Sequence, residues 1–193
     1  RTLTGVNSIV TARLTPAGGW EAPVTAANLG NNLASQVKVA VNDLGHAVLA
    51  WRQATAGSEI VWAQTYTPAG GWQTQVQLDF NDGATSYMPL ALAMDATGNA
   101  IVLWRHDIAG SGGASGIFHA RFVAGSGWTT ASALALGANV TAAYSPSVRF
   151  DAAGKAVAVW MQSGAAGSNI ASARWVPGSG WTATEVIETS NDA

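Results

Sequence analysis

Short apolar segments separated by polar turns run along the whole chain, and the same series of segments is repeated. Three copies are nearly complete, at 42–72, 95–128 and 151–181, whereas residues 8–20 match only the second half of a copy. The period is marked by the Trp of a Gly-Trp pair, found at Trp20, Trp72, Trp128 and Trp181, in steps of 52, 56 and 53 residues. A period of this length is typical of stacked or radial repeat architectures.

Each copy contains four apolar segments, several of which show the two-residue period of β-strands. The first, such as Val37–Val41, leads into a turn of the form Asp/Asn-x-x-Gly. We expect the Asp or Asn to cap its own backbone and the Gly to adopt a left-handed conformation. The second segment ends at a Trp, the third begins at an Ile and the fourth follows the Gly-Trp pair. In the three copies these residues are Trp51, Trp104 and Trp160, and then Ile60, Ile117 and Ile170.

Four antiparallel strands in a unit of about 53 residues predict a β-propeller blade. The fold class is therefore all-β, a β-propeller of four-stranded antiparallel blades, with about three and a half blades in this chain. We expect one partial domain over 1–193, divided into a half blade (1–30) and three blades (31–83, 84–139 and 140–193). The wide Trp side chains are expected to fill the wedges between blades.

The half blade contains only the third and fourth strands of the repeat. Open sheet edges readily pair with other chains. We therefore expect the chain to be a window of a longer propeller, or a subunit that needs another chain or further residues to complete the ring.

Composition narrows the classes of function. Charged residues make up only 10% of the chain, well below the usual quarter. The net charge of −2, with no basic cluster, argues against nucleic acid as a partner. No apolar run is long enough for a transmembrane helix. The absence of Cys excludes disulfides and thiolate metal sites. Low charge with many small residues and Trp favours a secreted, periplasmic or cell-surface protein.

The motif Asp-x-x-Gly-x-Ala-h-h-x-Trp (h is apolar), followed by Gly-Trp, resembles tandem β-propeller repeats of secreted or surface-anchored bacterial proteins. The resemblance covers nearly the whole chain and implies the fold, but no particular activity. The Ile…Gly-x-Gly-Trp rhythm is more distantly similar to fucose-binding propeller lectins, whose sites lie between blades and use Arg, Glu and Trp. Where that family has Glu, this chain has Thr11, Trp62, His119 and Ser172, so the sugar triad does not carry over.

The loops between second and third strands and the linkers between blades vary most among the copies, and both lie on one face of a propeller. Function is commonly carried by loops, so this face is the candidate binding surface, although unconstrained drift would give the same variation. Its polar candidates are Arg52, Gln53, Arg105, His106, Asp107, Gln162 and Asp82, with Tyr87 and Tyr144 as further members. A sugar site between blades would instead use Trp62 or Trp175.

Catalytic and metal-binding patterns are weak. His106 and Asp107 are adjacent, so on a strand their side chains point to opposite faces. The acidic stretch 79–83 lacks the spacing of a calcium loop. Glycosidases need a carboxyl pair about 5–10 Å apart, and three of the four Glu lie on or beside outer strands. We therefore predict a non-catalytic binding or scaffold module without cofactor or metal, which contacts a protein or carbohydrate ligand. The alternatives are a lectin that uses inter-blade Trp, and a fragment of a propeller enzyme such as a glycosidase.

Overall fold

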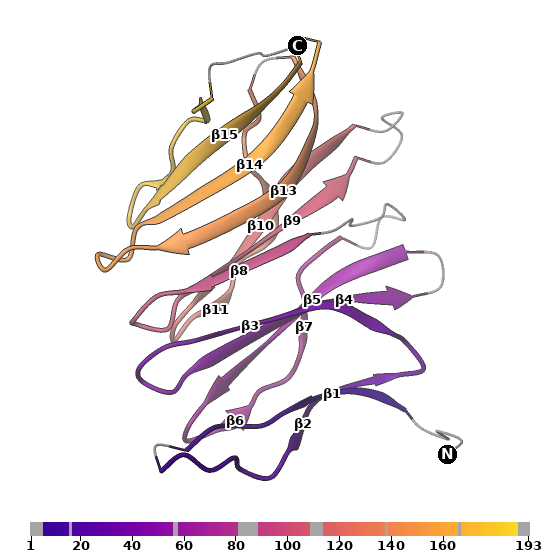
Figure 1. Ribbon diagram of the computed structural model, residues 1–193, viewed down its shortest axis with the longest axis vertical. Coiled ribbons are helices and arrows are strands. Elements are labelled where there is room, and N and C mark those ends of the chain that lie inside the picture. The colour runs from indigo at the N-terminus through magenta and orange to yellow at the C-terminus, as the bar shows by residue number, and fades with distance from the viewer. Residues whose placement is uncertain are drawn as a thin grey trace.

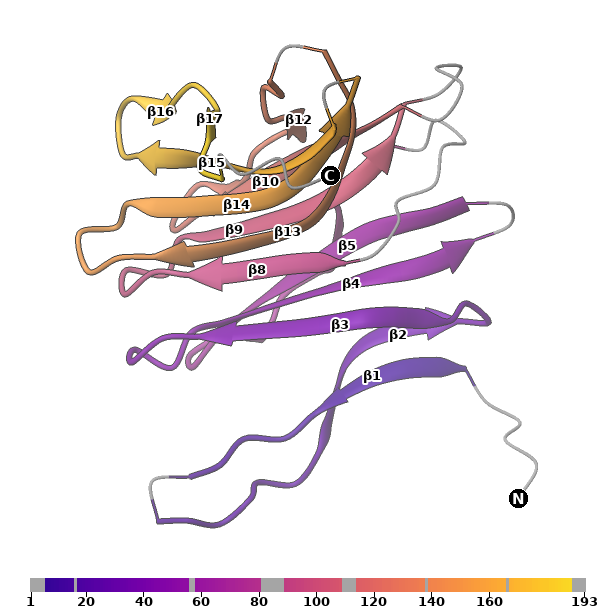
Figure 2. The ribbon, with the colours of Figure 1, turned by 45° about the horizontal axis from the view of Figure 1, so that its top comes forward.

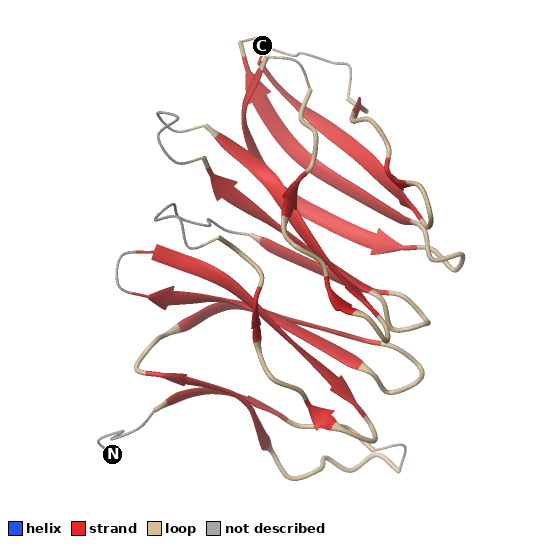
Figure 3. Cartoon of the chain, turned by 180° about the vertical axis from the view of Figure 1, so that it is seen from behind, coloured by secondary structure: helices blue, strands red, loops and turns tan. Residues whose placement is uncertain are grey.

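The computed structural model describes residues 6–15, 17–55, 58–80, 89–108, 114–137, 139–165 and 167–188. Over these residues the fold is all-β and contains no helix (Figure 3). Four antiparallel sheets follow one another in chain order along the longest axis of the molecule (Figure 1), and we number them sheets I to IV. Nothing in the described ranges forms an apolar helix of membrane-spanning length.

Sheet I has two strands, β1 (Asn7–Thr11) and β2 (Val24–Gly30). Sheet II contains β3 (Ala34–Val41), β4 (Ala47–Thr55), β5 (Ser58–Thr67), β6 (Gly71–Trp72) and β7 (Val76–Gln77). Sheet III contains β8 (Leu90–Met94), β9 (Ala100–Asp107), β10 (Ser115–Val123), β11 (Gly127–Trp128) and β12 (Ser132–Ala133). Sheet IV contains β13 (Val140–Phe150), β14 (Ala156–Gly164), β15 (Gly167–Val176), β16 (Gly180–Trp181) and β17 (Glu185–Val186).

Sheets II to IV share one topology, in which the first three strands form an antiparallel meander and two short outer strands both pair with the third. In sheet II, Tyr66 lies opposite Trp72 and Ala63 lies opposite Val76. Three steps along β5 therefore correspond to four along the outer segment, which defines a β-bulge. The same offset occurs in sheets III and IV. This bulge is why the single fourth strand expected from the sequence is divided into two.

The turn between the first and second strands forms as the sequence predicts. In sheet III, Asp95 Oδ1 accepts hydrogen bonds from the backbone N of Thr97 and of Asn99, both at 2.9 Å. Asn42 and Asp151 make the equivalent contacts in their own turns. The glycine of each turn has a positive φ, with values of 75°, 93° and 72° at Gly45, Gly98 and Gly154.

The core lies between the sheets. Trp51, Trp104 and Trp160 at the ends of the second strands are 0%, 0% and 1% exposed. Trp51 packs with Ile9 and Leu29 of sheet I, and the other two likewise face the sheet that precedes their own. Consecutive inner strands also contact one another, β3 with β8 and β8 with β13. These Trp side chains fill the spaces between sheets, as expected.

Trp20 differs from the other Trp residues of the Gly-Trp pairs. Trp72 is half-buried because it packs against sheet I, where its Nε1 donates to Thr11 Oγ1 at 3.0 Å. The same relation to the preceding sheet holds for Trp128 and Trp181. Within the described residues no sheet precedes sheet I, and Trp20 is 71% exposed. The prediction that the Trp side chains fill the wedges between blades is therefore wrong for Trp20.

Two segments expected to be linkers are strands. β2 extends to Gly30, where a linker between blades was expected, because Ala27 and Asn28 pair with β1. β13 begins at Val140, directly after the preceding blade and without an intervening linker, because Val140 pairs with Gly164 of the long β14. A register shift after Tyr144 interrupts this pairing, and Ser145 has a φ of 50°. Both additions depend on a partner strand rather than on a local apolar alternation.

Candidate functional site

Two of the predicted loop-face residues support the core Trp rings instead. Gln53 and Gln162 are 5% and 1% exposed. Gln53 Oε1 accepts from Trp51 Nε1 at 3.2 Å, and Gln162 Oε1 accepts from Trp160 Nε1 at 3.3 Å. Each Gln lies two residues after its Trp, so both side chains point to the same face of the strand. These amides satisfy the buried indole N–H groups in sheets II and IV.

In sheet III the place of that Gln is taken by His106, which is 2% exposed. Its Nδ1 lies 3.2 Å from Oδ1 of Asp79, a buried residue that follows β7 of sheet II. The rings of Phe80 and Phe118 pack edge-on against the imidazole, with centroids 5.7 and 5.1 Å away. His106 therefore joins sheets II and III. Trp104 Nε1 is left buried with no acceptor in the described part of the chain.

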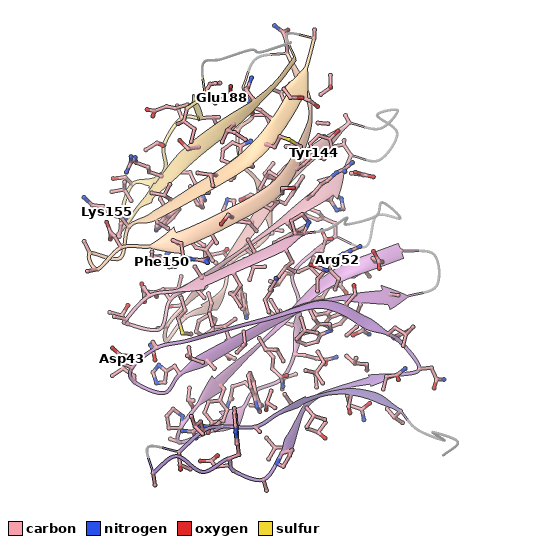
Figure 4. All side chains as sticks on the ribbon, viewed as in Figure 1. Asp43, Arg52, Tyr144, Phe150, Lys155 and Glu188 are labelled. Carbon is pink, nitrogen blue, oxygen red and sulfur yellow. The ribbon has the colours of Figure 1, made fainter. Side chains whose placement is uncertain are left out.

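Arg52 and Arg105 follow their Trp residues directly, so they point to the opposite face, toward the next sheet. Arg52, which is labelled in Figure 4, is 2% exposed. It forms an ion pair with Glu59. Arg105 Nη2 lies 3.0 Å from Asp107 Oδ1. The Arg105 guanidinium carbon also lies 4.6 Å from the centre of the Tyr144 ring in sheet IV, a cation–π contact. The two arginines thus lie in two separate junctions between sheets.

The remaining predicted residues are distributed differently. Asp82 and Tyr87 lie outside the described residues. Trp62 is half-buried and packs in the cluster between sheets I and II. The structure therefore does not gather the predicted loop-face residues into one pocket, and their contact with a ligand stays a prediction. Of the predicted residues that the structure describes, Trp175 lines a groove between two sheets.

This groove lies between sheets III and IV, at the end of the sheets where the first and second strands are joined. Its cavity volume is about 290 Å³. The walls are the turns 95–99 and 151–154, together with side chains of β10, β13 and β15. The polar and aromatic lining residues are Asp95, Thr97, Asn99, Arg121, Phe150, Asp151 and Trp175.

Arg121 and Trp175 stack on each other in the lining of the groove. The guanidinium carbon of Arg121 lies 3.7 Å from the ring centre of Trp175, and Trp181 packs against the indole at a centroid distance of 5.8 Å. Burial lowers the pKa of Arg121 below its ordinary value, and the charge of Asp95 opposes that change. Even with such a shift an arginine stays charged at neutral pH.

The carboxylate of Asp95 is held by its own turn. Oδ1 accepts from Thr97 Oγ1 at 2.8 Å in addition to the two backbone N–H groups, and Oδ2 accepts from Asn99 Nδ2 at 2.8 Å. Burial raises the pKa of Asp95, but these hydrogen bonds outweigh it and hold the pKa below its ordinary value. Asp95 is therefore ionised at neutral pH, and the groove contains fixed charges of both signs.

Sequence reasoning missed Arg121, although a regular spacing marks it. The residue seven positions before the Trp of each Gly-Trp pair is Arg13, Thr65, Arg121 or Arg174. Where this residue is an arginine and another sheet follows, its side chain meets an aromatic ring of that sheet. Arg13 lies 5.2 Å from the ring centre of Tyr66 and donates from Nη1 to its hydroxyl at 2.6 Å, as Arg121 meets Trp175. The spacing is visible in the sequence, but the partner ring is not.

The groove has the groups to bind a ligand. It presents a guanidinium, an amide, carboxylates and part of an indole, which suit a small molecule with several hydroxyl groups and a C–H face. Across the described ranges no group of three or more His, Cys, Asp or Glu is placed to hold a metal ion.

A second hollow, of about 260 Å³, lies at the opposite end of sheet IV, on the face predicted from loop variation. It has no charged or aromatic side chain among its described lining residues, which are Asn139, Val140, Ser163, Gly164, Ala165, Gly167 and Asn169. It offers backbone and amide groups but no anchor of the kind that usually dominates binding.

No family model and no curated protein sequence matches the chain. Solved structures that are similar include a Hadza microbial sialidase, with a TM-score of 0.57 and 11% identity over 77% of this chain and 36% of that one. A protein of unknown function from Dyadobacter fermentans has a TM-score of 0.56 and 14% identity over 98% and 62%. The polysaccharide lyase Uly1 has a TM-score of 0.55 and 12% identity over 79% and 40%. The chain spans at most 62% of the length of these structures, and the likeness shows an all-β, propeller-like fold.

Proposed function

We propose that this chain is a non-catalytic, extracytoplasmic carbohydrate-binding module that forms part of a β-propeller. In this proposal sheets II, III and IV are four-stranded blades and sheet I is a half blade. The shared strand order and the repeated contacts between consecutive sheets support the blades. The low charge of the chain supports a location outside the cytoplasm.

One observation carries the binding role, namely the groove in which Arg121 is stacked on Trp175. The accessible part of the indole can pack against the C–H face of a sugar ring, because such faces are apolar and flat. The guanidinium and the Asn99 amide can donate to hydroxyls, and the Asp151 carboxylate can accept from them. The volume of about 290 Å³ lies just below the range of roughly 300–1,000 Å³ for drug-sized ligands, which suits a single sugar ring.

Hydrolysis of the sugar in this groove is not supported. A glycosidase needs one carboxyl group as acid and a second as base or nucleophile, at about 5–10 Å. Both oxygens of Asp95 already accept hydrogen bonds within the turn. Asp151 Oδ1 accepts from the backbone N of Ala153 and of Lys155, both at 2.9 Å. Both oxygens of Asp95 are thus engaged in its turn, and only Oδ2 of Asp151 remains outside the hydrogen bonds of its turn, so the groove does not offer two available carboxyl groups.

The junction between sheets II and III provides a matched substitution, since it has Thr65 in place of Arg121 and Phe122 in place of Trp175. We expect Arg121→Thr and Trp175→Phe to keep the fold, because each installs the residue of an equivalent junction. A glycan array first identifies a glycan that binds the unchanged chain. Each substitution should then weaken the affinity for that glycan by about tenfold or more, which is typical when a residue at the centre of a binding interface is lost. Isothermal titration and Trp fluorescence quenching measure this.

The control is Arg13→Thr, at the equivalent position of the junction between sheets I and II. It should leave both glycan affinity and melting temperature nearly unchanged, since Arg13 is exposed. A glycan that binds Arg121→Thr and Trp175→Phe as well as it binds the unchanged chain would reject the groove as the site. An array without any bound glycan would reject the carbohydrate class.

A further inference from the structure

One edge of the strand β1 has no partner strand in the part of the chain that the structure describes. Within the described residues β1 pairs only with β2. In sheets II, III and IV the third strand has an additional partner on the other edge, the second strand of the same sheet. In sheet III this pairing runs along β9 from Ala100 to Asp107. Figure 2 shows β1 at the margin of the molecule, with that edge open.

The face of β3 next to this edge is apolar and exposed. Val37, Val39 and Val41 are 46%, 64% and 69% exposed. Val39 lies opposite Leu49 of β4, and Val148 of β13 lies opposite Ala158 of β14. Leu49 and Ala158 each stand two residues before the Trp of their strand, so Val39 and Val148 occupy the same position of the repeat. Val148 is only 1% exposed. The same position in the repeat is thus covered in sheet IV and uncovered in sheet II.

What covers Val148 is a β-hairpin of the preceding sheet. Val148 belongs to a buried cluster with Ala91 and Ala93 of β8 and with Ile101 and Leu103 of β9. The hairpin β8–β9 therefore does two things, since β9 pairs with β10 and the apolar face of the hairpin covers the next inner strand. Sheet I supplies only the equivalents of the third and fourth strands to sheet II.

We propose that the open edge of β1 and the valine face of β3 form one docking surface for an antiparallel β-hairpin with the pattern of β8–β9. The second strand of the incoming hairpin pairs with β1 in the register of β9 with β10. Two apolar side chains at the positions of Ile101 and Leu103 cover Val39 and Val41, because in sheet IV the cluster that contains Ile101 and Leu103 packs against the equivalent residues Val148 and Phe150. Backbone pairing supplies affinity and the side-chain pattern supplies specificity, as in other cases of strand addition.

A second copy of this chain does not fit the surface equally well. Its hairpins β3–β4, β8–β9 and β13–β14 are each already paired with their own third strand over eight or more residues. Among the described residues a copy offers single strand edges, those of β1 and of the inner strands β3, β8 and β13, but no unpaired two-stranded hairpin with the apolar face that the valines need. The occupant is therefore a hairpin that is not already part of a complete sheet.

The test uses the 193-residue chain and a synthetic peptide of residues 89–108, which carries the β8–β9 hairpin. The control peptide carries Ile101→Ser and Leu103→Ser, which remove the apolar face but keep the turn. The chain is also prepared as Val39→Lys and, as a matched control, as Leu44→Lys, because Leu44 is an exposed apolar residue of the adjoining turn. Titration gives affinity, and amide hydrogen exchange reports residues 7–11.

We expect the peptide to bind the unchanged chain and Leu44→Lys alike and to slow exchange of the amides in 7–11. Val39→Lys and the control peptide should each weaken binding by about tenfold or more. Absence of binding, equal binding to Val39→Lys, or binding without protection of β1 would each overturn the proposal. So would self-association of the chain that Val39→Lys abolishes, because a second copy would then be the occupant.

Discussion

Replacing Trp160 with Phe should destabilise this protein far more than the same replacement at Trp104. Both rings are fully buried at equivalent positions of sheets IV and III, so each change removes a similar volume. The two sites differ in polar contacts. Trp160 Nε1 donates to Gln162 Oε1, whereas Trp104 Nε1 has no acceptor among the described residues.

The magnitude follows from this difference. Phe is ~40 Å³ smaller than Trp, and at about 24 cal/mol per Å³ the residual cavity costs about 1 kcal/mol at either site. Trp160→Phe also leaves the Gln162 carbonyl oxygen buried without a donor, which costs about 1–3 kcal/mol more. Trp104→Phe instead removes an unsatisfied buried N–H, which offsets the cavity. We therefore expect a loss of about 2–4 kcal/mol for Trp160→Phe and roughly no loss for Trp104→Phe.

Urea denaturation of both variants, followed by Trp fluorescence and far-UV circular dichroism, measures the two free energies of unfolding. The slope of each transition must match that of the unchanged protein, so that the midpoints report stability. Equal losses at the two sites, within about 0.5 kcal/mol, would refute the assignment of the Gln162 hydrogen bond and of the unsatisfied Trp104 donor.

Two further predictions concern pH and backbone geometry. Burial, and then the nearby charge of Arg121, lower the pKa of His119 to about 4 from its ordinary 6.5. The unfolded chain therefore binds more protons between these values, so stability is full above pH 6.5 and falls by up to about 3 kcal/mol toward pH 4. His119→Gln should flatten this slope in urea titrations at several pH values, and an unchanged slope would contradict it. Gly98→Ala should cost at least about 1 kcal/mol more than Gly125→Ala, since both have positive φ but only the Gly98 Cβ meets His46 Nδ1, at 3.1 Å. Equal unfolding midpoints for these two variants would exclude the contact between turns.

The local pattern of the sequence was enough to predict the strands and turns of each repeat. The turn Asp95–Asn99 depends only on an Asp that caps its own backbone and on a Gly that tolerates a positive φ. The burial of Trp104 follows from its place in an apolar strand and its recurrence in every copy. The outer strand was predicted as one piece, because a one-residue bulge leaves no mark in the two-residue period.

The candidate site was decided by contacts between repeats. Arg52 and His106 were predicted at a loop surface, and both are buried at junctions between sheets. Arg121 was overlooked, yet it is stacked on Trp175, a residue 54 positions later in the chain. The sequence determined which residues recur at each position of the repeat, because hydrogen bonding and side-chain alternation act over a few residues. Only the tertiary structure decided which of them meet, because the rotation between consecutive sheets sets the distance between side chains of different repeats.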